Sequence, residues 1–125
     1  MAGTVAFDTL THSTAGSVAT SYVVEGVCKG WITADQTGTA AILDSLNVSG
    51  ITDNGTGDLT TAWSTNFANA NYAPVGDGLT TGGNYVGCSI HAIAAGTVQT
   101  ITQPSQSTGT LDCDKVFAQA VGELS

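Results

Sequence analysis

The side chains that could act as nucleophiles, bases or metal ligands are few and widely spaced. The chain has three cysteines, Cys28, Cys88 and Cys113. It also has two histidines, His12 and His91. Cys88 and His91 are three residues apart, as in many zinc sites, and the other two thiols would complete four ligands. In a strand, however, residues three apart point to opposite faces, so we expect no zinc site and interpret the cysteines as small buried apolar residues.

Motifs typical of catalysis or cofactor binding are absent from the sequence. No Gly-x-Ser-x-Gly segment presents a nucleophilic serine, and only the two histidines offer a base for a catalytic triad. No glycine-rich run is followed by Lys-Ser or Lys-Thr, which would cradle a phosphate. We therefore expect a protein that is not an enzyme and that binds no cofactor.

The densest group of oxygen-bearing side chains lies in the run DNGTGD at residues 53–58. Asp53, Asn54 and Asp58 resemble the alternating ligands of a calcium loop, but the bidentate glutamate that ends such a loop is missing. Gly55 and Gly57 tolerate a left-handed backbone, and Asp or Asn side chains can bond their own main chain. This pattern predicts a plain hairpin turn, with a cation site as a minor alternative.

Composition limits the partners that the chain can bind. Over 125 residues the formal charge is −8, and the only basic residues besides histidine are Lys29 and Lys115. Such a chain lacks the positive surface that binds nucleic acid or anionic lipid. No apolar run approaches the ~20 residues that cross a bilayer, and residues 1–5 do not resemble a signal peptide. Because 16 residues are glycine, we expect partner surfaces to complete the core.

Residues 46–63 give the clearest structural signal, a β-hairpin to which the other strands would be added. Leu46, Val48 and Gly50 alternate on one side of the turn, and Leu59 and Trp63 alternate beyond it. Further strands are predicted at residues 5–10, 20–33, 39–43, 63–67, 71–75, 85–93, 97–102 and 111–121. Because Gly26 and Gly30 interrupt residues 20–33, that segment forms either two strands or one sharply curved strand. The last segment is also compatible with a short helix, and residues 39–43 are expected to be buried. Residues 76–83 read as a surface loop or assembly contact, which includes Gly82 and Gly83.

Short strands at regular spacing, with no convincing helix, predict the fold class. We expect an all-β protein, an antiparallel β-sandwich or jelly-roll-like fold of about eight or nine strands, with residues 1–125 forming one domain. The large aromatic residues could fill the core, contact partners or form a sugar-stacking platform, and core or interface filling is the more common use. The contact candidates are Trp31, Trp63, Tyr72, Tyr85, Gly82 and Gly83, and Tyr22 joins the aromatic residues as a platform candidate.

Part of the sequence resembles a module of structural proteins from tailed bacteriophages. The likeness is carried by Lys29-Gly30-Trp31, residues 37–39, 44–49 and 51–58, and by Asn69 to Tyr72. In that family the corresponding runs are similar to KAW, GTGT, DSFNVSSITDNGTGDYTVNF and ANY. The resemblance spans residues 12–72. It departs at Gly30, where the family has alanine, and in the strand that ends at Trp63.

The resemblance implies a virion component and implies no active site. Among virion components, a small chain of this kind fits a capsid decoration protein that binds the major capsid protein or another structural protein and stabilises the head. We expect a homo-oligomer, with a trimer favoured, assembled in the host cytoplasm and located on the capsid surface. A tail-fibre or other tail appendage is the alternative within the same class, and a carbohydrate-binding module is the alternative from another class.

Overall fold

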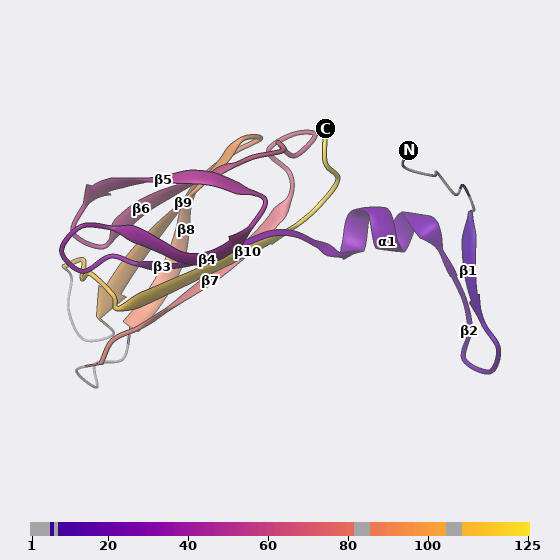
Figure 1. The fold of residues 1–125 in the computed structure, drawn as a ribbon, viewed down its shortest axis with the longest axis horizontal. Coiled ribbons are helices and arrows are strands. Elements are labelled where there is room, and N and C mark those ends of the chain that lie inside the picture. Colours follow the sequence, from indigo (N-terminus) through magenta and orange to yellow (C-terminus); the bar gives the residue numbers. More distant parts are fainter. Residues whose placement is uncertain (1–5, 7, 82–85, 105–108) are drawn as a thin grey trace.

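Two four-stranded antiparallel sheets pack face to face, and an arm projects from one end of this sandwich (Figure 1). The computed structural model describes residue 6 and residues 8–81, 86–104 and 109–125. The arm consists of β1 (Thr9–His12), β2 (Gly16–Ala19) and α1 (Thr20–Gly26). The first sheet has the order β4-β3-β10-β7, with β3 (Cys28–Asp35), β4 (Ala41–Leu46), β7 (Ala73–Leu79) and β10 (Lys115–Val121). The second has the order β5-β6-β9-β8, with β5 (Val48–Gly55), β6 (Asp58–Trp63), β8 (Val86–Ala94) and β9 (Thr97–Pro104).

The predicted hairpin is present as β5 and β6, but it does not include Leu46. Asn47 adopts a positive φ of 58°, which turns the chain between Leu46 at the end of β4 and Val48 at the start of β5. Leu46 therefore belongs to the first sheet and Val48 to the second. The hairpin therefore forms two of the four strands of the second sheet, and the chain crosses from the first sheet to the second at Asn47.

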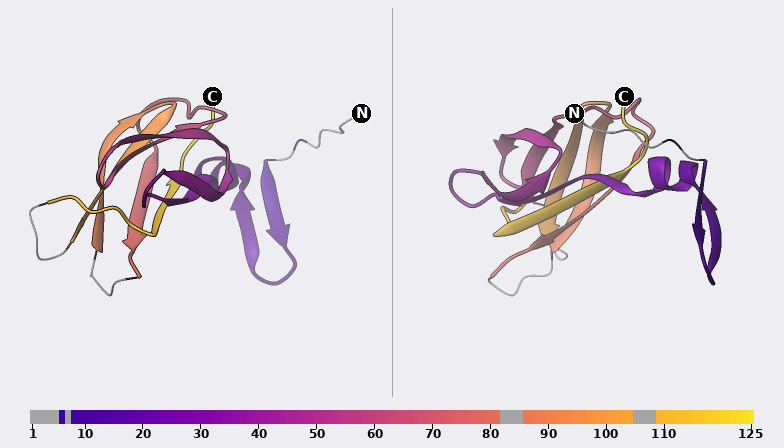
Figure 2. Two further views of the ribbon diagram at one scale, coloured as in Figure 1. Left: turned by 60° about the vertical axis from the view of Figure 1, so that its left-hand side comes forward. Right: turned by 45° about the vertical axis from the view of Figure 1, so that its right-hand side comes forward.

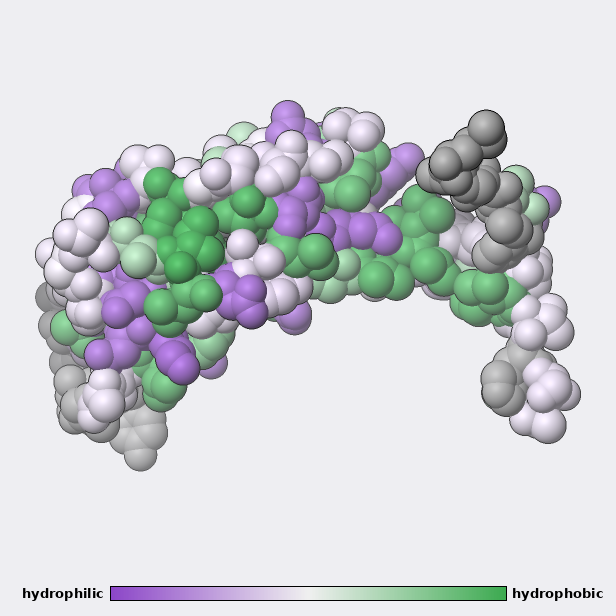
Figure 3. Space-filling view, viewed as in Figure 1, coloured by the Kyte–Doolittle hydropathy of each residue, from purple (hydrophilic) through white to green (hydrophobic). Residues whose placement is uncertain are grey.

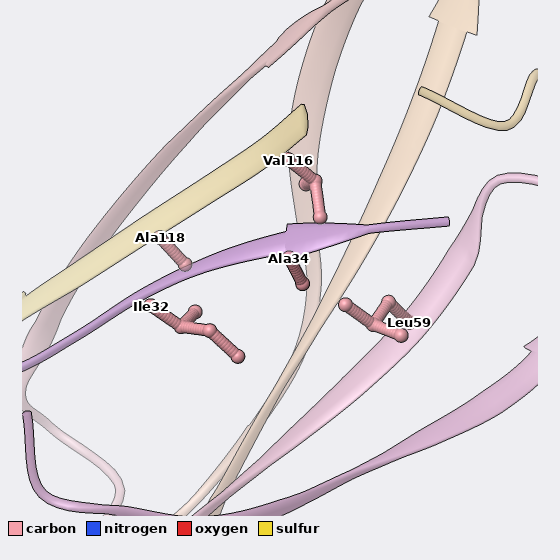
Figure 4. Close-up of a cluster of buried hydrophobic side chains, with 5 residues drawn as sticks. All are labelled: Ile32, Ala34, Leu59, Val116 and Ala118. Carbon is pink, nitrogen blue, oxygen red and sulfur yellow. The ribbon is translucent and has the colours of Figure 1, made fainter. Parts of the chain in front are cut away.

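The core lies between the sheets and follows from strict alternation along the central strands. In β3 and β10 every second residue is buried, which places Ile32 and Ala34 beside Val116 and Ala118. Leu59 reaches this group from β6 in the opposite sheet (Figure 4). Burying such side chains stabilises a fold by about 1.5–3 kcal/mol each for the larger ones.

A second cluster closes the end of the sandwich nearest the arm. Trp63, Phe67 and Tyr72 form it, with the Phe67 and Tyr72 rings stacked at a centroid distance of 4.0 Å. The Trp63 indole N–H donates to the Tyr72 hydroxyl at 3.2 Å, and that hydroxyl donates to the Thr97 carbonyl at 2.7 Å. Burial raises the pKa of Tyr72, and the bond from Trp63 acts in the opposite direction. Both polar atoms are thus satisfied inside an aromatic core.

A buried polar network ties the loops together at the opposite end. The Gln36 side-chain oxygen accepts from the Thr102 hydroxyl at 3.1 Å and from the Cys113 N–H at 3.2 Å. The Gln36 N–H donates in turn to the Cys113 carbonyl at 3.0 Å. Since buried polar groups are costly unless bonded, this network fixes where the segment before β10 enters the sandwich.

Thr61 in β6 is the one buried hydroxyl, among the described residues, whose oxygen lacks a hydrogen-bond partner. We expect Thr61→Val to raise the free energy of unfolding by about 1–2 kcal/mol, because an unsatisfied buried group costs that much. Thr100 on the neighbouring strand is equally buried, at 1% exposure, but its hydroxyl donates to the Leu59 carbonyl at 3.3 Å. Urea unfolding should therefore show stabilisation for Thr61→Val and none for the matched Thr100→Val; equal effects would contradict the assignment.

Four predictions of local structure were wrong. Residues 20–26 form helix α1 and not a strand. Tyr22, Val23 and Val24 favour strands only when they pair with a neighbouring strand in a sheet, and this segment has no such neighbour. Residues 41–46 form an exposed edge strand and not a buried one. Residues 76–79, predicted as part of a loop, belong to β7. Phe67, predicted in a strand, makes only an isolated bridge with Leu124.

Strands β8, β9 and β10 confirm the strands predicted at residues 85–93, 97–102 and 111–121, of which Tyr85 lies outside the described residues. Strand β1 begins only at Thr9, so it overlaps the strand predicted at residues 5–10 by two residues, and β7 begins at Ala73 within the predicted residues 71–75. Eight strands form the sandwich.

Candidate interaction surfaces

The DNGTGD run forms a turn whose oxygens are bonded within the protein. Asp53 accepts from the Gly55 N–H at 2.9 Å, which is the bond of an Asx turn. Asp58 accepts from the Asn54 side chain at 3.1 Å and from the Gln99 side chain at 2.7 Å. Gly55 and Gly57 have φ of 128° and 67°. These contacts give the run a structural role that needs no cation.

Gly57 also fastens the turn to the rest of the sandwich. Its N–H donates to the Asp112 carboxylate at 2.6 Å, and its carbonyl accepts from the Thr102 N–H at 2.8 Å. A Cβ atom on Gly57 would lie 2.7 Å from both the Leu111 nitrogen and the Thr102 carbonyl oxygen. The glycine is therefore required by space as well as by backbone angle.

The histidine and cysteine side chains are not brought together. Cys88 points inward from β8, whereas His91 lies at a bulge in the same strand and is exposed. No three His, Cys, Asp or Glu side chains within the described ranges are grouped to hold a metal ion. Burial raises the pKa of the Cys88 thiol to about 11, with further contributions from the charges of Asp77 and Cys113. Burial also raises the pKa of Cys113, so both groups are neutral thiols near pH 7.

These pKa shifts predict a loss of stability at alkaline pH. A Cys88 thiol of ordinary pKa 9.0 ionises in the unfolded chain while the folded chain keeps the proton up to about 11. The folded state therefore binds more protons in this window, and the free energy of unfolding falls as the pH rises from 9 to 11. Denaturant unfolding across this range should show a shallower decline for Cys88→Ala. The raised pKa values of Cys113 and Tyr72 also lower the free energy of unfolding at alkaline pH, so some decline remains in Cys88→Ala. An equal decline in the natural chain and in Cys88→Ala would contradict the raised pKa of Cys88.

Two of the predicted contact residues lie in the core. Trp63 is 4% exposed and Tyr72 is 7% exposed, so neither can touch a partner or stack on a sugar. Trp31 is half-buried on the outer face of the first sheet. Tyr85, Gly82 and Gly83 lie outside the described residues. A sugar-stacking platform made from the predicted aromatic residues is therefore not assembled in the described part of the fold.

The arm is one exposed apolar surface of the described residues. We define it as residues 8–27; none of its residues with a described side chain is buried. Its large apolar side chains are exposed by 37–71%: Leu10, Val18, Tyr22, Val23, Val24 and Val27. Figures 1 and 2 place the arm beyond the end of the sandwich, and Figure 3 shows apolar surface along it. Its helix has seven residues, far fewer than a bilayer span requires.

The arm is joined to the sandwich through a lysine. The Lys29 ammonium at the start of β3 donates to the Val23 carbonyl at 2.9 Å. Val23 lies in the last turn of α1, where carbonyls lack partners within the helix and a positive charge is favourable. Within the arm, the Thr20 N–H and hydroxyl both donate to the Asp8 carbonyl, at 2.8 and 3.1 Å. These bonds define the direction of the arm but bury no apolar side chain.

The second exposed apolar surface is the outer face of the first sheet. Residues paired across neighbouring strands share a face, so the register places three rows of side chains there. The rows are Leu46-Trp31-Gln119-Val75, then Asp44-Thr33-Phe117-Asp77, then Lys115-Leu79. We call the apolar members of these rows the apolar face: Trp31, Leu46, Val75, Leu79 and Phe117. A shallow hollow of about 360 Å³ lies on this face, with Trp31, Val75 and Phe117 in its lining.

The predicted contact candidates include Trp31 of the apolar face, but they include neither the arm nor the other four residues of that face. Phe117 alternates with buried residues along β10, and Val75 and Leu79 alternate with half-buried residues along β7. The signal for the arm was the pair Val23-Val24, which was read as part of a strand. Comparisons of the chain with protein-family models, with curated proteins and with solved structures return no match.

Proposed function

We propose that this chain is a structural subunit of a tailed-bacteriophage particle, and specifically a decoration protein that binds the outer surface of the major capsid lattice and stabilises the head. The resemblance of residues 12–72 to phage structural modules supports the class of assembly. The arm supports a role in binding other proteins, because it is folded yet has no core of its own.

The observation that carries the proposal is this lack of a core in the arm. A two-stranded hairpin is marginally stable alone in water, and so is a helix shorter than ~12–15 residues. The arm combines a hairpin of four-residue strands with a helix of seven residues, and it displays six large apolar side chains. Such a segment gains stability only when a partner surface covers it.

The size of the exposed surface agrees with a missing partner. The chain exposes 7398 Å², whereas a compact monomer of 12.5 kDa exposes about 6,200 Å². The excess of about 1,200 Å² exceeds the ~800 Å² that each partner contributes to a standard stable interface. A subunit that binds many equivalent sites on a shell would stabilise the shell by mass action.

The charge is suited to an outward-facing subunit. Ten acidic residues against two lysines give the formal charge of −8, which resists adhesion to DNA and disfavours aggregation. The neutral thiols of Cys88 and Cys113, together with the separation of Cys88 from His91, support a role without catalysis.

Purified particles test the proposal through copy number and through stability. A decoration protein is present in hundreds of copies, as mass spectrometry of purified particles would measure, and its removal lowers the temperature at which the heads release DNA. Particles that lack the protein, or stripped heads with unchanged heat resistance, would contradict the proposal.

A tail appendage is the second candidate, and the placement of the arm favours it. The arm lies at the N-terminal end of the chain and the sandwich lies beyond it, so an arm fixed in a tail would present the sandwich outward (Figure 1). Copy number separates the two roles, because a tail part is present in only a handful of copies per particle.

A further inference from the structure

We infer that Asp44 and Asp77 block the two edges of the first sheet against the addition of a further strand, so that copies of this chain do not join edge to edge through that sheet. This block acts whether or not the chain belongs to a phage particle, and it goes beyond the proposed function.

The two aspartates lie at opposite ends of one row of side chains. The strand order β4-β3-β10-β7 makes β4 and β7 the end strands of the first sheet. The row that crosses all four strands is Asp44-Thr33-Phe117-Asp77. Both aspartates are exposed. The row therefore ends in a carboxylate at each edge of the sheet.

Each carboxylate binds a backbone N–H of its own strand. The Asp44 carboxylate accepts from the Ser45 N–H at 2.8 Å. The Asp77 carboxylate accepts from the Gly78 N–H, also at 2.8 Å. The same bond, from an aspartate to the residue that follows it, is thus present in both end strands. Hydrogen bonds to ionised groups are stronger than those between neutral groups, so a competing strand must break a strong bond to use either N–H.

The register shows that the Gly78 N–H faces the open edge of β7. A Cβ atom on Gly76 would lie 2.8 Å from the Phe117 carbonyl oxygen, so that carbonyl points from β10 toward β7. Phe117 and Asp77 are therefore a hydrogen-bonded pair. Hydrogen-bonded and non-hydrogen-bonded pairs alternate in an antiparallel ladder, so the next pair, Val116 and Gly78, is not hydrogen-bonded. The Gly78 N–H thus points away from β10.

The same alternation places the Ser45 N–H at the open edge of β4. The backbone groups of Val116 point toward β3, so those of its partner Ala34 point toward β10. Ile32, two residues earlier in β3, points the same way. Ser45 is the partner of Ile32 in β4, so its N–H points away from β3.

Each edge also carries a second obstacle to strand pairing. Pro74 lies four residues before Gly78 in β7, so it occupies another position that faces the edge, and proline has no N–H to donate. In β4 the register with β3 shifts between Thr33 and Ala34, which marks a bulge or irregularity in the ladder. Natural sheets block their edges with charged side chains, proline and bulges. The aspartates therefore belong to a set of features that act in the same direction.

Strand β4 is an edge at which such a block is needed. Its side chains Ile42, Leu43 and Leu46 are 37–52% exposed. An exposed apolar edge strand is a template for pairing with another chain. Without the block, β4 would offer both apolar side chains and free N–H groups to a second copy.

Sedimentation velocity tests the inference with two double variants of equal charge. Asp44→Ala with Asp77→Ala removes both acceptors, whereas Asp44→Asn with Asp77→Asn keeps a side-chain oxygen beside each N–H. Both variants lose two of the ten acidic side chains. The alanine pair should form assemblies larger than those of the natural chain, at a protein concentration at least about tenfold lower, because a hydrogen bond to a charged group contributes that much. The asparagine pair should stay closer to the natural chain than to the alanine pair.

Amide hydrogen exchange locates the contact in these assemblies. The Ser45 and Gly78 amides should exchange more slowly in the assembled alanine pair than in its dissociated form, because each N–H then bonds a strand of a second copy. Both aspartates are exposed, so we expect the variants to keep the fold. If the alanine pair unfolds, Asp44→Ala and Asp77→Ala as single variants carry the same test, each for one edge.

Three results would overturn the inference: an alanine pair that assembles no further than the natural chain, an asparagine pair that assembles as strongly as the alanine pair, or assemblies in which Ser45 and Gly78 gain no protection. None of these results depends on the copy number of the chain in phage particles, which tests the proposed function separately.

Discussion

Replacing Gly57 with alanine lowers the free energy of unfolding by about 2–5 kcal/mol, the larger of two effects that we expect from single methyl groups. The φ of 67° costs an L-residue about 1–2 kcal/mol, and forcing a methyl group into a filled space costs about 1–3 kcal/mol more. The new Cβ would lie 2.7 Å from backbone atoms of Leu111 and Thr102, which cannot turn aside as a side chain can.

Gly38 provides a control that separates the two causes. Its φ of 68° is almost the same as that of Gly57, but a Cβ at Gly38 would meet nothing within 4 Å. Gly38→Ala should therefore show only the backbone cost of about 1–2 kcal/mol in urea unfolding. If the two variants lose equal stability, the contact between the turn and the segment before β10 does not constrain the fold as described.

Gly30→Ala destabilises the sandwich by about 1–3 kcal/mol, because the added methyl group meets the Trp63 ring. The Cβ would lie 2.7 Å from Cζ3 and 2.9 Å from Cε3 of that indole. A phenylalanine ring at position 63 would remove this obstruction, so we expect the effects of Gly30→Ala and Trp63→Phe on stability to be coupled.

A double-mutant cycle measures this compensation. Gly30→Ala combined with Trp63→Phe should be less destabilised than the sum of the two single variants, by about 0.5–3 kcal/mol. Gly50→Ala is the matched control, since a Cβ there meets nothing within 4 Å and its backbone is unstrained. Strict additivity of the two changes would show that the indole and the glycine are not coupled.

The fold class was predictable because most of this chain consists of strands with one face buried. Alternation in residues 85–93, 97–102 and 111–121 identified β8, β9 and β10, and the glycines and aspartates of residues 53–58 identified the turn. The turn at Asn47 was missed, since a positive φ at a residue other than glycine leaves little trace in a sequence. The helix was missed because β-branched residues indicate strands only where a sheet receives them.

The interaction surfaces were harder to predict than the fold. An exposed aromatic residue and a buried one look alike in a sequence, so Trp63 and Tyr72 were predicted as contacts although they fill the core. Phe117 was not, although its side chain lies on the apolar face. The difference depends on which face of β10 is covered by the second sheet, and pairing between strands decides that.

Backbone amide hydrogen exchange in the arm tests most directly whether this protein works through what it binds. We expect the amides of β1, β2 and α1 to exchange rapidly in the dilute, dissociated chain and to become strongly protected when the chain is assembled with its partners, while those of β3 and β10 are protected in both states. Protection of the arm in the dissociated chain equal to that of the sandwich, or no gain of protection on assembly, would contradict it.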